Sequence, residues 1–290
     1  MTAPADELRL QDGRRLAYQQ YGTADGEPVM FFHGWPGSRL DFAPNDAAAT
    51  EAGVRVVAVD RPGIGGSDHQ PGRTVLDWAK DVAALADSLA LERFAVLGFS
   101  FGGPYARACA YAIPERVTRA GLVSCLGPID DPAAKRGMPP PTRYGLAAAR
   151  LSPLLARPMV AFTARQSRGG KMVEQLAKSM APADAEVLKR PEVREGLAAS
   201  LAESFRQGNG PATWDGVAVA RGEGFRLENI ETEVLIWHGE QDRNDPVEMA
   251  RAQERRLPHV RAIYYPDDGH LIFFSRMHEI LPELVAGGAP

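Results

Sequence analysis

Short hydrophobic runs, most of them followed by a loop rich in glycine or proline, recur in the first and last parts of the chain. Their length and composition are typical of buried strands. We place these strands at residues 29–32, 54–59, 94–97, 119–123, 234–238 and 260–265. Ahead of them, residues 7–10 and 15–18 flank the dipeptide Asp12-Gly13, which predicts a β-hairpin.

Helical patterns separate the predicted strands. In the segment 74–91, apolar residues recur near helical spacing and Thr74 can cap the N-terminus. We place helices at about 42–52, 74–91, 104–112, 246–257 and 271–285. This alternation predicts an α/β fold, a mostly parallel central sheet flanked by helices. The loops 33–37, 60–68 and 98–103 follow strands, so they should converge outside the carboxyl ends, where such sheets carry their chemistry.

The pattern changes between residues 127 and 226, where no segment has the pattern of a strand. This part opens with a proline-rich stretch, which is typical of a linker. Helices are expected at about 142–156, 158–167, 171–180, 183–190 and 191–207, with a weaker one around 214–220. We therefore expect residues 127–226 to form a helical cap inserted into a core domain made of residues 1–126 and 227–290.

Large apolar side chains in the cap and in the loops beneath it are candidates for lining a substrate pocket. They are Trp35, Phe99, Phe162, Phe205 and Trp214. Packing of the cap against the core is the competing role for the cap side chains, and it is the commoner role for residues of this kind. The same two roles apply to Met159, Met172 and Met180. Residues 193–205 carry an apolar stripe with a four-residue repeat, which favours packing.

Composition and charge narrow the class of protein. The 290 residues are 44% hydrophobic and 24% charged, an ordinary balance for a globular protein. The net charge is −4 and no block of Lys and Arg occurs, so a small-molecule substrate is expected rather than nucleic acid or a membrane surface. The N-terminal residues lack the pattern of a signal peptide, and we expect a cytoplasmic protein. No coiled coil is evident, and the sequence sets no oligomeric state.

The sequence contains two cysteines, Cys109 and Cys125. Cys109 lies in the predicted helix 104–112, and Cys125 follows the predicted strand 119–123. Two reduced thiols in the core fit these positions better than a disulfide or a metal site. We expect neither a metal nor a cofactor.

The segment 98–103, Gly-Phe-Ser-Phe-Gly-Gly, carries the pattern that points most directly to chemistry. Ser100 lies between a predicted strand and a predicted helix, with glycine two residues to each side, which is the G-x-S-x-G nucleophile elbow. The sharp turn strains the serine backbone, and larger side chains at Gly98 and Gly102 would collide with neighbouring backbone. Ser100 should then stand at the edge of the sheet, near a helix N-terminus that favours a developing oxyanion.

A serine hydroxyl needs a base within hydrogen-bond reach, and the base needs an acid that orients it. Of the six histidines, His270 alone lies in a loop after a late strand, and the serine–acid–histidine order of this architecture makes it the base. Asp242 follows the strand 234–238 after a short turn and is the first choice for the acid. Asp245 is its nearest rival. The weaker candidates are Asp130, Asp131, Asp267 and Asp268.

Backbone amides should form the oxyanion hole. One is the amide of Phe101, the residue after the nucleophile. The other should come from the loop 33–37, and we assign it to Trp35, because Pro36 has no N–H to donate. We expect His33 to shape this loop rather than to transfer protons.

Five segments resemble, in chain order, the motifs of the α/β-hydrolase fold superfamily, and the resemblance covers the chain from end to end. They are HGWPGS at 33–38, DRPGIGGSD at 60–68, GFSFGG at 98–103, GEQDRNDP at 239–246 and DDGH at 267–270. The resemblance implies that Ser100, Asp242 and His270 form a catalytic triad, and that Asp60 and Arg61 hold loops by hydrogen bonds. Serine stands where epoxide hydrolases and haloalkane dehalogenases of this fold carry aspartate, which disfavours alkyl-enzyme chemistry.

From these features we expect a serine hydrolase that cleaves an ester-like bond (a carboxylic ester, thioester or lactone) of a small, largely apolar molecule through an acyl-enzyme. One alternative keeps the triad but not this hydrolysis: a C–C bond-cleaving enzyme, a lyase, an acyltransferase or a cofactor-free haloperoxidase-like enzyme. Another is a ligand-binding protein without turnover, against which the presence of all three triad residues argues. The sequence does not name the substrate, because the cap would set the selectivity.

Overall fold

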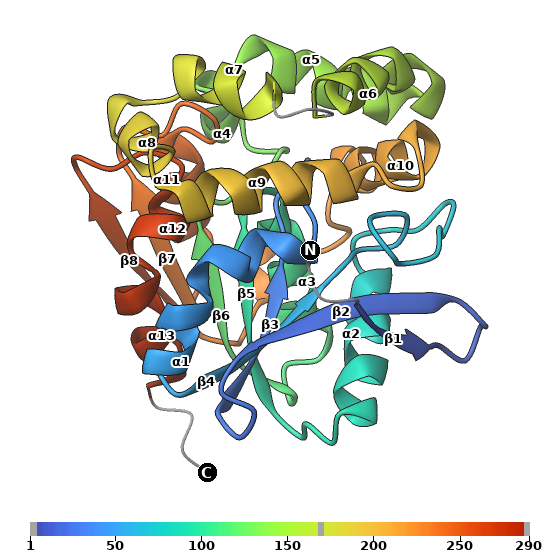
Figure 1. The fold of residues 1–290 in the computed structure, drawn as a ribbon, viewed down its shortest axis with the longest axis vertical. Helices are drawn as coiled ribbons and strands as arrows, with labels where there is room; N and C mark the ends of the chain where they lie inside the picture. The colour runs from blue at the N-terminus through green and yellow to red at the C-terminus, as the bar shows by residue number, and fades with distance from the viewer. Residues whose placement is uncertain (1–4, 168–170, 287–290) are drawn as a thin grey trace.

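The computed structural model describes residues 5–167 and 171–286 (Figure 1). Its centre is an eight-stranded sheet with the order β1-β2-β4-β3-β5-β6-β7-β8. The strands are β1 (Asp6–Arg9), β2 (Arg15–Gly22), β3 (Glu27–Phe32), β4 (Val54–Val59), β5 (Phe94–Phe99), β6 (Val117–Val123), β7 (Val234–Gly239) and β8 (Val260–Tyr265). The hairpin β1–β2 joins the sheet antiparallel to β4, and the pairs from β4 to β8 are parallel. The predicted mostly parallel sheet is confirmed.

Helices cover both faces of this sheet. One face carries α2 (Asp77–Ser88), α3 (Gly103–Ala112) and α11 (Val247–Glu254), and the other carries α1 (Asp46–Glu51) and α13 (Met277–Val285). Side chains alternate between the two hydrophobic cores along each strand. In β5, Val96 enters the first core and Leu97 enters the second. Because β5 is buried on both faces, its carboxyl end is firmly placed.

Two predicted helices are interrupted. The helix expected at 42–52 is a 3₁₀ helix, η1 (Arg39–Asn45), followed by α1, and the Ser38 hydroxyl accepts a hydrogen bond from the Leu40 amide at its start. The helix expected at 271–285 is divided into α12 (Ile272–Ser275) and α13. At the junction Arg276 leaves helical geometry, with φ of −116° and ψ of 9°. The spacing of apolar residues does not predict such local interruptions of a helix.

Between β6 and β7, the described residues form helices and no strand. These helices are α4 (Pro132–Arg136), α5 (Pro140–Leu151), α6 (Pro153–Ser167), α7 (Lys171–Ser179), α8 (Pro182–Val187), α9 (Pro191–Ser204) and α10 (Asn209–Ala220). We call residues 127–226 the cap. The break expected near residue 157 lies at Ser152, whose backbone is extended, while Pro158 lies inside α6. Residues 168–170 of the expected cap lie outside the described residues.

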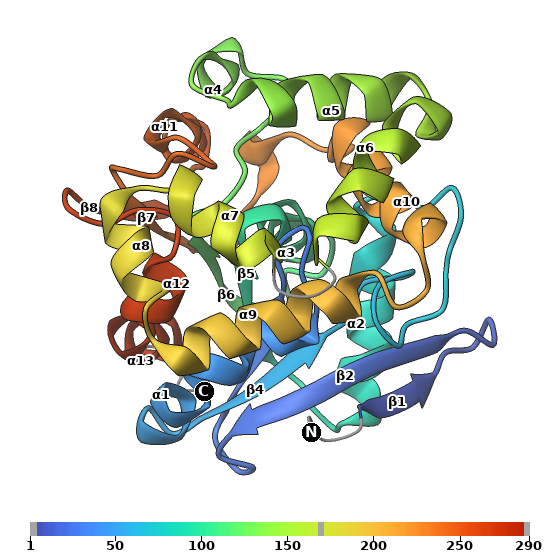
Figure 2. The ribbon, with the colours of Figure 1, turned by 45° about the horizontal axis from the view of Figure 1, so that its top comes forward.

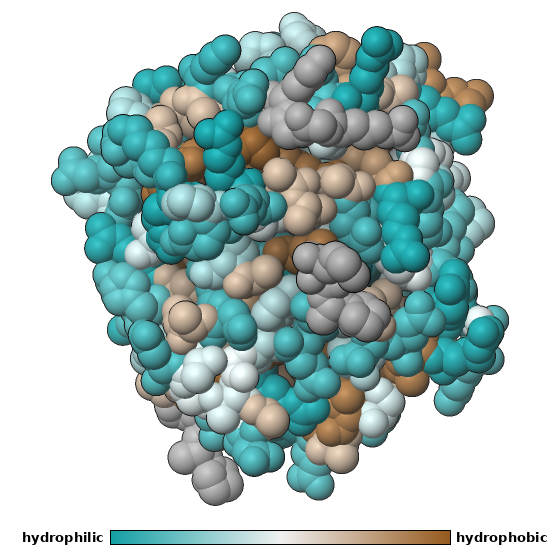
Figure 3. All heavy atoms as spheres, viewed as in Figure 1, coloured by the Kyte–Doolittle hydropathy of each residue, from teal (hydrophilic) through white to brown (hydrophobic). Residues whose placement is uncertain are grey.

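The cap lies across the carboxyl ends of the parallel strands (Figures 1 and 2). In Figure 2, α5, α6, α7 and α9 are arranged around the end of β5 and the start of α3. The predicted stripe on α9 is buried, because Val193, Leu197 and Leu201 join the core that contains Phe42 of η1. The face in Figure 3 is mostly hydrophilic, with hydrophobic side chains gathered between α9 and the helices above it.

Cys109 and Cys125 are both buried and free, as expected for reduced core thiols. Within the described ranges, no helix combines the length and the hydropathy needed to cross a bilayer.

Candidate active site

Ser100 lies at the turn from β5 into η2 (Ser100–Gly102), directly before α3. Its φ is 53°, a left-handed conformation that costs free energy for any residue with a Cβ. At both flanking positions, close contacts with the backbone leave no room for a Cβ, so glycine is required. A Cβ on Gly102 would lie 2.0 Å from the carbonyl oxygen of Phe32, and one on Gly98 would lie 2.7 Å from the carbonyl carbon of Gly102. The strained elbow with its two glycines is therefore present in the structure.

His270 follows β8, and its Nδ1 lies 2.8 Å from Oδ2 of Asp242, which follows β7. The carboxylate is itself fixed, because its Oδ1 accepts hydrogen bonds from the amides of Asn244 (2.8 Å) and Asp245 (2.9 Å). An ionised carboxylate can only accept, so Nδ1 carries the proton and Nε2 is the other ring nitrogen to be considered for chemistry. The structure thus brings the predicted base and the predicted acid together.

The charges around the imidazole of His270 change its pKa. Burial lowers this pKa, but the charge and hydrogen bond of Asp242, with smaller contributions from Asp245 and Asp184, raise it to about 9. The net effect of this environment is to stabilise the imidazolium form. A base that must hold a proton during a reaction benefits from such stabilisation.

The Ser100 hydroxyl donates a hydrogen bond to Oδ2 of Asp245 at 3.1 Å. Within the described residues, Asp245 is the hydrogen-bond partner of this hydroxyl, and His270 is not. Asp245 was the nearest rival for the acid, and the structure places it beside the nucleophile instead of beside Nδ1 of the histidine. Burial raises the pKa of Asp245, the His270 charge lowers it, and the Asp242 charge raises it further, so that the net effect is a pKa of about 7.

His238, at the end of β7, belongs to the same cluster. Its Nε2 donates to the backbone carbonyl of Asp245 at 2.7 Å and lies 3.5 Å from Oδ2 of Asp242. Burial lowers the pKa of His238, so the ring is neutral and supports the loop that carries both carboxylates. From the sequence, His238 is simply the last residue of the predicted strand 234–238. Its position directly before the segment 239–246 was the available signal for this role.

The weaker acid candidates have other positions. Asp268 pairs with Arg276 at 2.9 Å, and Asp130 pairs with Arg256 at 3.1 Å. Asp131 caps α4 by accepting from the Ala133 amide at 2.7 Å. Asp267 is exposed. These four carboxylates therefore serve turns, caps and surface ion pairs.

Arg61 holds the loop 33–37 through hydrogen bonds to its backbone. The guanidinium donates to the carbonyl oxygens of His33 and of Gly34, the latter at 2.9 Å. The Gly34 amide donates to Asp41 at 3.1 Å. Because C=O and N–H point in opposite directions across a trans peptide, the Trp35 amide is directed away from Arg61. A Cβ on Gly34 would lie 3.5 Å from that of Ser100, so this loop lies against the nucleophile.

His33 is fully buried and neutral. Its Nε2 accepts from the Arg61 amide at 3.2 Å, so Nδ1 carries the proton and donates to the Gly34 carbonyl at 2.8 Å. Burial, followed by the charge of Arg61, lowers the pKa of His33 well below its ordinary value. Asp60 also holds loops, since it accepts from Arg39 and from the Gly66 amide.

A buried ionic cluster ties the cap to this loop. Asp215 of α10 accepts from Arg61 at 2.8 Å, from the Tyr105 hydroxyl at 2.8 Å, and from Arg73. Burial alone would raise the pKa of Asp215, but the charges of Arg61 and Arg73 outweigh it and lower that pKa. The sequence held no signal for this cluster, because Asp215 is far from both arginines along the chain.

The predicted pocket residues separate into two groups. The Phe99 ring lies 5.1 Å from the His270 ring, and the Trp35 ring lies 6.0 Å from that of Phe101, measured between centroids. Phe205 packs in a small core with Ile64 and Val160, which Trp35 also contacts. These aromatic side chains lie beside the nucleophile elbow or between it and the cap.

The other two predicted pocket residues lie further out. Phe162 is 63% exposed, while Val160 and Ala164 on the same helix are buried. A residue two positions away from these lies on the opposite side of a helix, so Phe162 faces away from the buried side of α6, and its place in a pocket stays a prediction. Trp214 is half-buried, with its ring 6.4 Å from that of His69.

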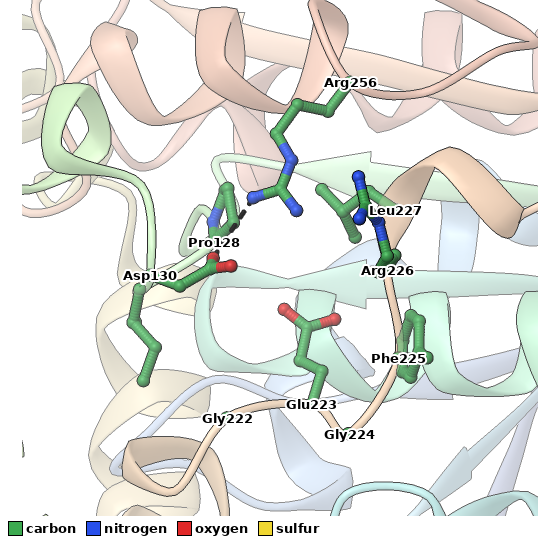
Figure 4. A pocket seen from close by; sticks show the side chains of 10 residues that line it. Pro128, Asp130, Gly222, Glu223, Gly224, Phe225, Arg226, Leu227 and Arg256 are labelled. Carbon is green, nitrogen blue, oxygen red and sulfur yellow. Dashed lines mark hydrogen bonds and ion pairs between the residues drawn. The ribbon is translucent and has the colours of Figure 1, made fainter.

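A surface cleft of about 320 Å³ lies between the segments that connect the cap to the core. Residues 128–130, 222–227 and Arg256 line it, and Arg256 pairs there with Asp130 (Figure 4). Asp130, a weaker candidate for the acid, lines this cleft, whereas Ser100, Asp242 and His270 do not. Throughout the described part of the chain, no three His, Cys, Asp or Glu side chains gather in a way that could hold a metal ion.

Three features of this structure define the α/β-hydrolase class of enzymes. They are the mostly parallel sheet, the strained serine at the end of β5, and the pair formed by an aspartate after β7 and a histidine after β8. A family model described as "alpha/beta hydrolase fold" matches residues 27–276, and the chain belongs to this family.

The chain is similar to several known members. A bifunctional esterase/perhydrolase of Acinetobacter calcoaceticus is 27% identical over 286 residues, which cover 96% of this chain and 98% of that protein. A non-heme chloroperoxidase of Streptomyces lividans is 43% identical over 124 residues. That match covers 42% of this chain and 45% of the relative, so it spans less than half of the known protein.

Solved structures show the same architecture. A bromoperoxidase from Bacillus anthracis superposes with a TM-score of 0.72 at 22% identity, covering 97% of this chain and 99% of that one. An esterase from Exiguobacterium antarcticum superposes with a TM-score of 0.69 at 20% identity, covering 97% of both chains. At these identities the likeness shows the fold alone.

Proposed function

We propose that this protein is a serine hydrolase that cleaves an ester-like bond of a small molecule through an acyl-enzyme. The observation that carries the proposal is the 2.8 Å hydrogen bond between His270 Nδ1 and Asp242. In the neutral ring, this bond fixes the tautomer in which Nε2 can accept a proton. The histidine also follows β8, which is its position in serine hydrolases of this fold. The esterase activity named for the full-length relative from Acinetobacter supports the same reaction class.

In the proposed mechanism, the Ser100 hydroxyl turns from Asp245 toward Nε2 of His270 when substrate binds. Ser100 Oγ attacks the carbonyl carbon as its proton passes to Nε2, and Asp242 stabilises the resulting imidazolium. The protonated His270 then gives this proton to the departing alkoxide. Water, deprotonated by the neutral His270, attacks the acyl-enzyme, and the carboxylic acid and free Ser100 are released.

The amides of Trp35 and Phe101 would hold the oxyanion in both steps. The direction of the Trp35 amide, away from Arg61, supports this role. Phe101 lies at the start of the helical segment that leads into α3, where free amides and the positive end of the helix dipole favour a negative charge. Losing one such donor typically costs a hundredfold or more in rate, roughly.

The test is turnover of p-nitrophenyl acetate and butyrate by the wild type and by Ser100→Ala. We expect Ser100→Ala to lose at least about a thousandfold in kcat/KM. A fluorophosphonate probe should add its mass to the wild type and leave the variant unmodified. Gly216→Ala, in which the new Cβ meets no atom within 4 Å, is the matched control for handling and folding. Equal turnover by the wild type and Ser100→Ala would refute the proposal.

A second reaction of the same acyl-enzyme is perhydrolysis, in which hydrogen peroxide replaces water. The name of the Acinetobacter relative, a bifunctional esterase/perhydrolase, supports this candidate. Peroxide would attack the acyl carbonyl, give its proton to His270, and leave as a peracid with release of Ser100. Peracid formation from ethyl acetate and peroxide would be measured by bromide oxidation. Peracid production that is the same in Ser100→Ala would exclude this route.

A further inference from the structure

Asp245 places an extra carboxylate beside the nucleophile, in addition to the one that orients the histidine. Its Oδ2 accepts the Ser100 hydroxyl at 3.1 Å, and the residue is only 3% exposed. Its position is fixed on both sides: its amide donates to Asp242, and its carbonyl accepts from His238. These contacts hold the backbone of Asp245, so its buried carboxylate depends on Ser100 for a hydrogen bond, and a buried charge with so few partners is costly.

The hydrogen bond between Asp245 and Ser100 limits what the serine hydroxyl can do. Among the residues that the structure describes, the Ser100 hydroxyl is the donor to Oδ2 of Asp245. A serine hydroxyl has one proton to give. While Ser100 donates to Asp245 it cannot donate to Nε2 of His270, so the first proton transfer requires this hydroxyl to leave Asp245.

Substrate is the natural source of a donor that replaces this hydroxyl at Asp245. In the acyl-enzyme the carbonyl carbon is bonded to Oγ of Ser100, and the next carbon of the acyl group is one bond further on. A hydroxyl or ammonium group on that carbon comes within hydrogen-bond reach of a carboxylate that lies 3.1 Å from Oγ. Hydrogen bonds to an ionised carboxylate are among the stronger ones in proteins.

We propose that Asp245 is a specificity-determining residue that binds a hydroxyl or ammonium group on the carbon next to the scissile carbonyl, and so releases the Ser100 hydroxyl to His270. The expected substrates are esters of 2-hydroxy or 2-amino acids, whose acyl groups carry a hydrogen-bond donor. This inference rests on the proposed ester hydrolysis. A site built to bind a polar group discriminates strongly against the analogue that lacks it.

The surrounding charges agree with this assignment. Asp242 and Asp184 add two more carboxylates around His270, and Cys125 is a buried neutral thiol. Among the described residues, His270 is the cationic group whose charge shifts the pKa of Asp245. A cationic or hydroxylated acyl group therefore meets a site of negative character, which favours it over an anionic one.

The test compares ethyl lactate, alanine ethyl ester and ethyl 2-fluoropropionate, three esters of nearly the same size, by titration of the released acid. Fluorine withdraws electrons as oxygen and nitrogen do but donates no hydrogen bond, so it controls for intrinsic reactivity. We expect the wild type to prefer the two donor-bearing esters, in kcat/KM, by about tenfold to a hundredfold. A wild-type ratio near one would overturn the inference without any variant.

Two substitutions separate charge from hydrogen bonding. Asp245→Val removes both and should bring the wild-type preference to within about threefold of unity. Asp245→Asn keeps an acceptor oxygen but no charge, so it should retain part of the preference for ethyl lactate and lose that for alanine ethyl ester. Ratios between substrates at one pH cancel any effect of the substitutions on the protonation of His270.

The failure of this inference can be told from failure of the proposed function. Turnover of the fluoro ester that depends on Ser100, combined with an unchanged preference in Asp245→Val, would overturn the role of Asp245 alone. Turnover that is equal in the wild type and Ser100→Ala would remove the proposed function. If Asp245→Val does not fold, Asp245→Asn and the wild-type ratios still decide the matter.

Discussion

Asp184, on α8 of the cap, accepts hydrogen bonds from the backbone amides of His270 at 3.1 Å and of Leu271 at 2.7 Å. Its carboxylate is buried, and burial raises its pKa while those amides and the charge of His270 lower it. Gly269 makes room for it, because a Cβ there would lie 2.3 Å from Oδ2 of Asp184. The cap therefore holds the histidine loop directly.

Replacing Asp184 by alanine should lower both stability and activity, because two buried amides lose their acceptor. We expect a loss of about 1 to 3 kcal/mol in the free energy of unfolding, measured by denaturant titration. We also expect a fall in kcat/KM through kcat, since His270 is less well placed. Asp184→Asn keeps one acceptor oxygen and should show a smaller effect on both. Equal values for Asp184→Ala and the wild type would show that this contact does not position His270.

The raised pKa of His270 predicts how activity depends on pH. The neutral ring is the form that accepts the proton of Ser100, so below a pKa of about 9 its fraction falls tenfold per pH unit. We expect kcat/KM to rise with pH and to level off above about 9. The measurement is a profile from pH 5 to 10 with an ester that does not titrate.

Asp242→Asn is the variant that tests the cause of this shift. Removing the charge of Asp242 should move the midpoint of the pH profile down toward the ordinary histidine pKa. The plateau should also fall, by roughly a thousandfold to ten-thousandfold, because the tautomer is no longer fixed. An unchanged midpoint in Asp242→Asn would mean that another group controls the profile.

Breaking the buried cluster of Asp215 should destabilise the protein strongly. Asp215→Asn leaves Arg61 and Arg73 buried without their counter-charge, and such a loss typically costs about 3 to 5 kcal/mol. The exposed ion pair of Lys189 with Glu186 provides a control, in which Glu186→Gln should cause little or no change. Chemical denaturation of the two variants would measure the difference, and similar values for both would contradict the assignment.

The elbow should not tolerate a methyl group. A Cβ on Gly102 would lie 2.0 Å from the Phe32 carbonyl oxygen, so Gly102→Ala must displace β3 or the elbow itself. We expect a loss of about 3 kcal/mol or more, together with loss of activity. Gly216→Ala is the matched control on α10, where the added methyl group has open space and should stabilise the helix by up to about 1 kcal/mol. Thermal melting of both variants would decide the question.

The two phenylalanines of the predicted pocket should respond differently to truncation. Phe205 is buried in the small core that cap residues form with Ile64, so Phe205→Ala should cost about 3 to 5 kcal/mol. Phe162 is exposed, so Phe162→Ala should leave the unfolding transition nearly unchanged. A large loss of stability in Phe162→Ala would contradict the placement of this side chain.

Most of the sheet could be predicted from the sequence, because each parallel strand is a short run buried on both faces. β4 and β8 begin and end where the hydrophobic runs do. The elbow was also readable, since the contacts that Gly98 and Gly102 make are the reason for their spacing from Ser100. The pairing of Asp242 with His270 followed from chain order and loop position.

Other features of the site depend on contacts between distant segments, which local patterns do not encode. Nothing near Asp184 in the sequence indicates that it binds the amides of a loop more than eighty residues away. Asp245 was weighed only as an acid for His270, because spacing cannot tell toward which partner a side chain turns. The burial of Phe162 could not be predicted for the same reason: its helix carries apolar residues on two sides, and only packing decides which side is covered.

The cluster around Asp215 has a consequence for engineering. The two arginines belong to the segment before α2, whereas their shared aspartate is supplied by α10. A chimera that exchanges this cap for one from another hydrolase would leave two buried positive charges beside the loop 33–37 without a counter-charge. A successful transplant must bring an acidic residue to the same place, or replace both arginines at once.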